Sequence, residues 1–237
     1  MEHPTPALPE LGAHDGLSYA LFLPDGEARA GVVILHGAGS AKESHFDFAR
    51  GCQADGIAAL AYDARGHGRS DGAFGPGALD DVAAMLALLR DRAGVDRLAL
   101  RGSSMGGFQA IHAAANDPSL RAVVAICPAP EESLLRMLGS DEPLRFECDV
   151  GATEVWLESL DLYESAARLG DDTALLLLHA RGDEQIPWTV SERVHEAAHE
   201  PKRLLVLPGG HHRSLQHDME LQAVSRRWIL RAAGSDR

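Results

Sequence analysis

The chain has 237 residues, of which 45% are hydrophobic and 24% charged, so its length and composition fit one large α/β domain with a sizeable core. The formal net charge of −13 argues against nucleic acid or an anionic membrane surface as a partner. The 3 cysteines follow no spacing pattern, which favours reduced thiols in a cytoplasmic protein. We expect no signal peptide at residues 1–10, no membrane-inserted segment and a single domain over 1–237.

Apolar patterning predicts alternating strands and helices along the chain. Asp15-Gly16, between segments 8–13 and 17–23, indicates a hairpin with a tight turn. Continuous apolar runs predict buried strands at 31–35, 57–62, 98–100, 122–127, 174–179 and 203–207. Helical spacing predicts helices over 42–54, 79–92, 189–198 and 215–232, and a further helix after Ser104. This alternation implies a mostly parallel central sheet with an antiparallel amino-terminal hairpin and helices on both faces.

The most informative segment is residues 102–106, a G-x-S-x-G centred on Ser104, between a predicted strand and a predicted helix. A serine on such a sharp turn presents its hydroxyl, and side chains two positions away would collide with the neighbouring strand and helix. The helix start would offer N–H groups to a developing anion. A glycine-rich turn with a solvated serine is the alternative.

Two further candidates follow later predicted strands. Asp183 is the first carboxylate after strand 174–179, and His211 and His212 follow strand 203–207. Taken singly, a turn aspartate and a solvated histidine pair are ordinary features. No partner at metal-ligand spacing accompanies the histidines, so we expect no metal and no cofactor. Together, a serine, an acid and a histidine, each directly after a predicted parallel strand, have the chain order of one fold's catalytic triad.

The sequence resembles the α/β-hydrolases over nearly its whole length. It is most similar to small serine carboxylesterases of the monoacylglycerol-lipase-like and dienelactone-hydrolase-like groups, with some likeness to prolyl aminopeptidases. The motifs that carry the resemblance are residues 36–39 (HGAG), 63–70 (DARGHGRS), 102–106 (GSSMG), 181–187 (RGDEQIP) and 208–212 (PGGHH). Many dienelactone hydrolases have a cysteine where this chain has Ser104, which favours plain ester hydrolysis.

The resemblance implies a role for each candidate residue. Ser104 would be the nucleophile, His212 the general base and Asp183 the orienting acid. The N–H groups of Ala38 and Met105 would form the oxyanion hole. Because the family's pattern places its histidine at the second of the two positions, it falls on His212 rather than His211.

Residues 130–172 are too long for a simple connection between two strands, and the fold implies a short helical cap there. Apolar residues at helical spacing within it include Trp156, Leu160 and Tyr163, which either line an acyl pocket or pack on the core. Residues 131–172 contain twelve carboxylates and three arginines. A negative cap would repel acidic substrates, so we expect a preference for uncharged esters.

The sequence thus predicts a serine esterase acting on a small ester of short to medium acyl chain. A peptidase or amidase of the prolyl-aminopeptidase-like group, and a hydrolase-fold protein that binds without catalysis, remain open alternatives. The sequence leaves the natural substrate and the oligomeric state undetermined.

Overall fold

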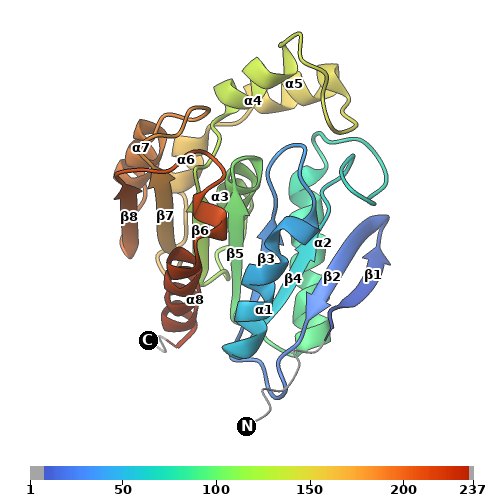
Figure 1. The fold of residues 1–237 in the computed structure, drawn as a ribbon, viewed down its shortest axis with the longest axis vertical. Helices are drawn as coiled ribbons and strands as arrows, with labels where there is room; N and C mark the ends of the chain where they lie inside the picture. Colours follow the sequence, from blue (N-terminus) through green and yellow to red (C-terminus); the bar gives the residue numbers. More distant parts are fainter. Residues whose placement is uncertain (1–7, 235–237) are drawn as a thin grey trace.

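A computed structural model describes residues 8–234, which form one eight-stranded sheet between two layers of helices (Figure 1). The strand order is β1-β2-β4-β3-β5-β6-β7-β8. The β1–β2 and β2–β4 pairs are antiparallel and the other five pairs are parallel. The strands are β1 (Glu10–His14), β2 (Leu17–Phe22), β3 (Ala30–Leu35), β4 (Ile57–Tyr62), β5 (Leu98–Ser103), β6 (Ala122–Ile126), β7 (Ala174–Ala180) and β8 (Lys202–Leu207). The predicted fold class is confirmed.

Two apolar clusters, one on each face of the sheet, hold the helices. The first cluster joins one face of the strands to α2, α3, α6 and α7, and the second joins the other face to α1 and α8. The helices are α1 (Phe46–Ala54), α2 (Ala78–Ala93), α3 (Met105–Asn116), α4 (Glu131–Leu138), α5 (Val150–Glu158), α6 (Leu162–Ala167), α7 (Thr189–Ala197) and α8 (Met219–Gly234). Strands β3, β4, β5 and β7 are fully buried because both of their faces are covered.

Two of the predicted helices are interrupted near their starts. Short 3-10 helices, η1 (Lys42–His45) and η2 (Leu215–His217), precede α1 and α8. Asp218 has an extended backbone, and its carboxylate accepts hydrogen bonds from the N–H groups of Glu220 and Leu221. This cap starts α8 at Met219, so the predicted helix over 215–232 is broken at Asp218.

The segment predicted as a cap, 130–172, divides between two places. Figure 1 shows α4 and α5 above the carboxyl ends of the strands, whereas α6 lies lower and packs against α3 and α7. Glu131, the first residue of α4, holds the start of this helix in place, because its carboxylate lies 2.7 Å from His112 Nε2. Ser165 Oγ, on α6, lies 2.8 Å from Nδ1 of the same ring. His112 is therefore buried and hydrogen-bonded to residues of both α4 and α6.

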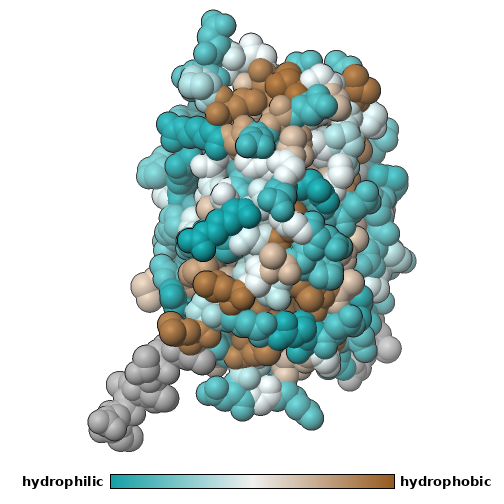
Figure 2. All heavy atoms as spheres, turned by 90° about the vertical axis from the view of Figure 1, so that its right-hand side faces the viewer, coloured by the Kyte–Doolittle hydropathy of each residue, from teal (hydrophilic) through white to brown (hydrophobic). Residues whose placement is uncertain are grey.

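The surface beside β1 is mixed in polarity. In Figure 2, hydrophilic groups surround separate hydrophobic ones, some of which gather at the upper end of the molecule, where Figure 1 places α4 and α5. Val150 and Val155 on α5 are among the exposed large hydrophobic side chains. Within residues 8–234, no helix is both long enough and apolar enough to cross a membrane.

Candidate active site

Ser104 lies at the turn from β5 to α3 with a left-handed backbone, φ 55° and ψ −116°. Its N–H donates to the carbonyl of Ile126 on β6 at 2.9 Å, and its carbonyl accepts from Ala129 N–H at 3.2 Å. A non-glycine residue in this conformation is held there by its surroundings. The strand–turn–helix geometry expected for the segment is thus present, with the serine at its apex.

The two glycines that flank this turn are required by close backbone contacts. A Cβ at Gly102 would overlap the carbonyl oxygen of Gly106, within the turn into α3. A Cβ at Gly106 would overlap the carbonyl oxygen of Leu35, the last residue of β3. The expected collisions with the helix and with the neighbouring strand are therefore both confirmed.

Asp183 and His212 meet at the carboxyl ends of β7 and β8. His212 Nδ1 lies 2.8 Å from Asp183 Oδ2, and the exposed fractions of the two side chains are 5% and 0%. Asp183 Oδ1 accepts hydrogen bonds from the N–H groups of Gln185 and Ile186. His211, by contrast, is exposed, so the structure brings only one histidine of the predicted pair to the carboxylate.

A second buried histidine lies behind Asp183. His179 Nε2 is 3.4 Å from Asp183 Oδ2 and 3.0 Å from the carbonyl of Ile186, while Nδ1 is 2.7 Å from Ser191 Oγ. Burial alone would raise the pKa of Asp183, but hydrogen bonds from His179, His212 and the Ile186 N–H outweigh it and hold that pKa well below its usual range. Asp183 is therefore ionised and oriented as an acceptor for His212.

Cys127 is a third buried residue beside Asp183, and its backbone has a positive φ of 44°. One ligand-type atom from each of Cys127, His179 and Asp183 lies within 4.8 Å of the others. Burial raises the pKa of the Cys127 thiol, so the sulfur is protonated at neutral pH. The proximity of His179 and Cys127 to Asp183 could not be predicted from the sequence, because it depends on packing between β6 and β7.

The loop after β3 lies against Ser104. A Cβ at Gly37 would come within 3.4 Å of Ser104 Cβ, and Ala38 and Gly39 line the same cavity as Ser104. Met105 is the first residue of α3, so its N–H has no acceptor inside the helix. The two residues expected to form the oxyanion hole thus lie beside Ser104.

Two buried polar groups hold this loop. Ala64 N–H donates to His36 Nε2 at 3.0 Å, so the proton is on Nδ1, which donates to the Gly37 carbonyl at 2.8 Å. His36 therefore links the loop after β3 to the loop after β4. Lys42 Nζ contacts Asp63 Oδ2 at 2.6 Å, with exposed side-chain fractions of 3% and 0%. Burial alone would raise the pKa of Asp63, but hydrogen bonds from Lys42 and Arg69 outweigh it, so the pKa lies below its usual value.

A cavity of about 870 Å³ lies at this edge of the sheet and contains the side chains of both Ser104 and His212 in its lining. One wall is formed by the loop after β3, and another by the loop after β8 with Arg213. Further lining residues come from α4 and the segment after it: Ser133, Leu134, Arg136, Met137, Ser140, Glu142, Pro143, Leu144, Arg145 and Phe146. The predicted nucleophile and base therefore share one cavity large enough for a small ester.

Trp156, Leu160 and Tyr163, the residues predicted to bind substrate, are not part of this lining. All three pack against the hydrophobic core beside α3. The Trp156 ring makes edge contacts with Phe74 and Phe108, at centroid distances of 5.9 and 5.7 Å. We therefore correct the assignment: the apolar stripe packs on the core because α5 and α6 turn this face inward, and α4 supplies the cavity wall instead.

The charge around the cavity also differs from the expectation. Among the twelve carboxylates of residues 131–172, Glu142 alone lines the cavity, whereas two of the three arginines, Arg136 and Arg145, do so. Arg213 adds a third guanidinium from the opposite wall. The count of acidic residues along the segment therefore gives no basis for expecting a preference for uncharged esters, because the carboxylates point elsewhere.

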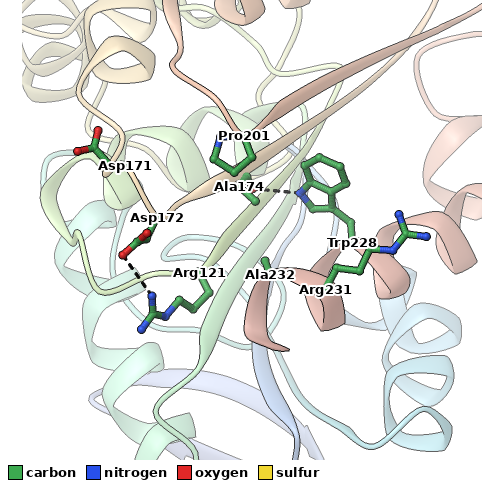
Figure 3. A pocket seen from close by; sticks show the side chains of 8 residues that line it. All are labelled: Arg121, Asp171, Asp172, Ala174, Pro201, Trp228, Arg231 and Ala232. Carbon is green, nitrogen blue, oxygen red and sulfur yellow. Dashed lines mark hydrogen bonds and ion pairs between the residues drawn. The ribbon is translucent and has the colours of Figure 1, made fainter. Parts of the chain in front are cut away.

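A smaller hollow, of about 210 Å³, lies at the opposite, amino-terminal edge of the sheet (Figure 3). In it Arg121 pairs with Asp172 at 3.5 Å, and Trp228 Nε1 donates to the Ala174 carbonyl at 3.1 Å. None of the predicted catalytic residues lies in its lining. The chemistry suggested by the sequence is therefore confined to the larger cavity.

Comparisons with known proteins agree with this architecture. Residues 26–140 match the family described as serine aminopeptidase, S33. The uncharacterized protein YfhR of Escherichia coli K12 is 28% identical over 194 residues, which cover 80% of this chain and 65% of YfhR. The chain thus spans about two thirds of the length of this relative.

Two solved structures illustrate the similarity of fold. DcsB, solved in complex with a substrate analogue, has a TM-score of 0.80 and 18% identity, covering 95% of this chain and 99% of DcsB. The monoacylglycerol lipase of Paleococcus ferrophilus has a TM-score of 0.73 and 20% identity, covering 91% of this chain and 99% of the lipase. The protein therefore has the α/β-hydrolase fold, and its residues 26–140 resemble the serine aminopeptidase S33 family.

Proposed function

We propose that the protein is a serine hydrolase that cleaves carboxylic esters of short to medium acyl chain. The observation that carries the proposal is the shared cavity, in which Ser104 on its strained turn and His212 bound to a buried Asp183 both take part. A strained serine beside a histidine–carboxylate pair is the arrangement that activates a hydroxyl for acyl transfer.

In the proposed reaction, His212 removes the proton of the Ser104 hydroxyl as the oxygen attacks the ester carbonyl. Asp183, already bonded to Nδ1 at 2.8 Å, fixes the tautomer that leaves Nε2 free and stabilises the imidazolium. The N–H groups of Ala38 and Met105 stabilise the oxyanion, each contributing about 3–4 kcal/mol in comparable enzymes. The alcohol leaves with the proton from His212, and water activated by His212 then releases the acid from Ser104.

The lining of the cavity favours esters over peptides with a free amino terminus. An aminopeptidase must bind a protonated amine, which calls for carboxylates close to the nucleophile. The described lining contains one carboxylate, Glu142, and three arginines. This distribution supports the ester substrate over the aminopeptidase alternative suggested by the family description.

Labelling and kinetics test the proposal. A serine-directed fluorophosphonate should label the wild type and the Ser103→Ala variant, and should not label Ser104→Ala. With 4-nitrophenyl butyrate, hexanoate and octanoate, Ser104→Ala should lower kcat about 10⁴-fold or more, since it removes the attacking oxygen. Thermal unfolding of each variant checks that the fold is retained. Hydrolysis by Ser104→Ala at the wild-type rate, or no hydrolysis of any ester by the wild type, would reject the proposal.

A further inference from the structure

Three arginines line the cavity around Ser104 without a carboxylate partner among residues 8–234. They are Arg136 on α4, Arg145 in the segment between α4 and α5, and Arg213 in the loop after β8. Unpaired guanidinium groups that converge on a cavity are suited to bind an anion.

Arg145 is the best placed of the three. Its Cβ, Cγ and Cδ atoms lie 3.1 to 3.8 Å from the position that a Cβ would take on Gly39, which has φ +65°. The stem of Arg145 therefore packs on the loop that contains Ala38, and the residue lines the same cavity as Ala38 and Ser104. A Cβ at position 39 would press on the stem of Arg145, so the glycine allows Arg145 to pack on this loop.

The backbone that follows Arg145 is held by contacts with the loop after β4. The Phe146 ring stacks on His67 with centroids 4.3 Å apart and an interplanar angle of 14°. Glu147 N–H donates to the Gly66 carbonyl, and Phe74 N–H donates to the Glu147 carbonyl, both at 2.9 Å. Because these bonds join the segment to the loop after β4, Arg145 starts from an ordered backbone and loses less entropy when it binds a ligand.

A fourth positive charge, on the buried side chain of Arg101, lies next to the cavity lining. Arg101 is 1% exposed, stacks on Phe48 at 4.0 Å and donates to the carbonyl of Gln216, a residue that lines the cavity. Its Nε has no hydrogen-bond partner. Burial lowers the pKa of Arg101 to about 10, so the group remains charged at neutral pH. This uncompensated charge adds to the positive field in the cavity.

We propose that the substrate is an ester that carries an anionic group, a carboxylate or a phosphate, and that Arg145, Arg136 and Arg213 bind it. This inference rests on the proposed ester hydrolysis and names its substrate class. The net charge of −13 does not oppose it at close range, because charges more than about 10 Å away are largely screened at 0.1 M salt. The arginines act within that distance on a ligand inside the cavity.

Two matched pairs of substrates test the proposal, one for each source of charge. The carboxylate pair is mono-4-nitrophenyl adipate and 4-nitrophenyl hexanoate, which share a six-carbon acyl chain. The phosphate pair is 1-hexanoyl-glycerol 3-phosphate and 1-monohexanoylglycerol, followed by release of hexanoate. For at least one pair, the wild type should have the larger kcat/KM for the anionic member. The ratio should fall about three- to tenfold in Arg145→Gln, and further in the triple variant with Arg136→Gln and Arg213→Gln.

The control is Arg227→Gln, which removes an exposed arginine outside the cavity and should leave both ratios unchanged. Thermal unfolding confirms that each variant is folded. Ratios at or below one in the wild type, or ratios that the arginine substitutions do not alter, would overturn the substrate class while leaving ester hydrolysis intact. If no neutral or anionic ester is cleaved in a Ser104-dependent way, the proposed function itself fails.

Discussion

The two ends of the sheet use arginines and carboxylates in opposite ways. At the amino-terminal edge, two arginines and two aspartates line a hollow of about 210 Å³, and Arg121 is paired with Asp172 (Figure 3). At the carboxyl edge, three arginines and one glutamate line a cavity of about 870 Å³. Charges at the first edge are balanced within the fold, whereas those at the second are left for a ligand.

The two edges of the sheet also differ in the backbone conformation of their residues. Within residues 8–234, the positive φ values at the carboxyl edge include those of two non-glycine residues, Ser104 and Cys127, whereas those that precede β4 and β5 at the amino edge belong to Gly56 and Gly94. Such positions persist only where the surrounding structure holds them, and they concentrate at functional sites. The comparison therefore predicts that substitutions at the carboxyl edge have large effects on activity and packing, and that those at the amino edge have small ones.

The largest effect should come from His212. His212→Ala should lower kcat about 10⁴-fold or more with little change in KM, since the base for Ser104 is lost. His211→Ala, which removes the exposed neighbour, should stay within about threefold of the wild type. Steady-state kinetics with 4-nitrophenyl hexanoate measures both. Loss of turnover in His211→Ala with normal turnover in His212→Ala would reverse the assignment.

Gly106→Ala should cost about 2–4 kcal/mol of unfolding free energy, because the new methyl group would overlap the Leu35 carbonyl on β3. Gly209→Ala is the matched control, since nothing lies within 4 Å of a Cβ added there, and its effect should stay within about 0.5 kcal/mol. Urea unfolding followed by circular dichroism compares the two. Equal stabilities would show that β3 and α3 are not in tight contact at this position.

The free energy of unfolding should fall as the pH drops, because the buried His67 becomes protonated. Burial lowers the pKa of His67 to about 4, below the value of about 6.5 expected in the unfolded chain. Protonation therefore favours unfolding: the contribution is complete above about pH 6.5 and is lost as the pH falls toward 4. The expected loss is roughly 3 kcal/mol, since each pKa unit corresponds to about 1.4 kcal/mol.

His67→Gln should reduce this pH dependence, because it removes the titrating ring that stacks on Phe146. His199→Gln replaces an exposed histidine and should retain the wild-type dependence. The measurement is the melting temperature of the three proteins at intervals between pH 4 and 7.5. A variant at position 67 with the same slope as the wild type would show that other groups cause the loss.

The smallest effect is expected at the amino edge. Arg121→Gln breaks an ion pair whose side chains are 41% and 57% exposed, so the unfolding free energy should change by at most about 0.5 kcal/mol. The kcat/KM for both members of each substrate pair should stay within about twofold of the wild type. A larger change in activity would mean that the amino edge of the sheet influences the cavity at the carboxyl edge.

The strand segments along the chain, the turn at Ser104 and the places of Asp183 and His212 after their strands could be predicted from the sequence alone. These features are local: hydrophobic period, glycine spacing and the end of a strand are all visible within a few residues. The meeting of Asp183 with His212 at 2.8 Å also follows from topology, because β7 and β8 are parallel neighbours whose carboxyl ends share an edge.

Which side chains face the cavity depends on the tertiary structure. The helical period around Trp156 marks an apolar face, but the period is the same whether that face meets a ligand or α3. Arg145 reaches Gly39 because Glu147 bonds to Gly66 and Phe74, contacts between segments about seventy to eighty residues apart. Such long-range pairing leaves no local pattern, so the charge lining the cavity could not be read from the composition of residues 131–172.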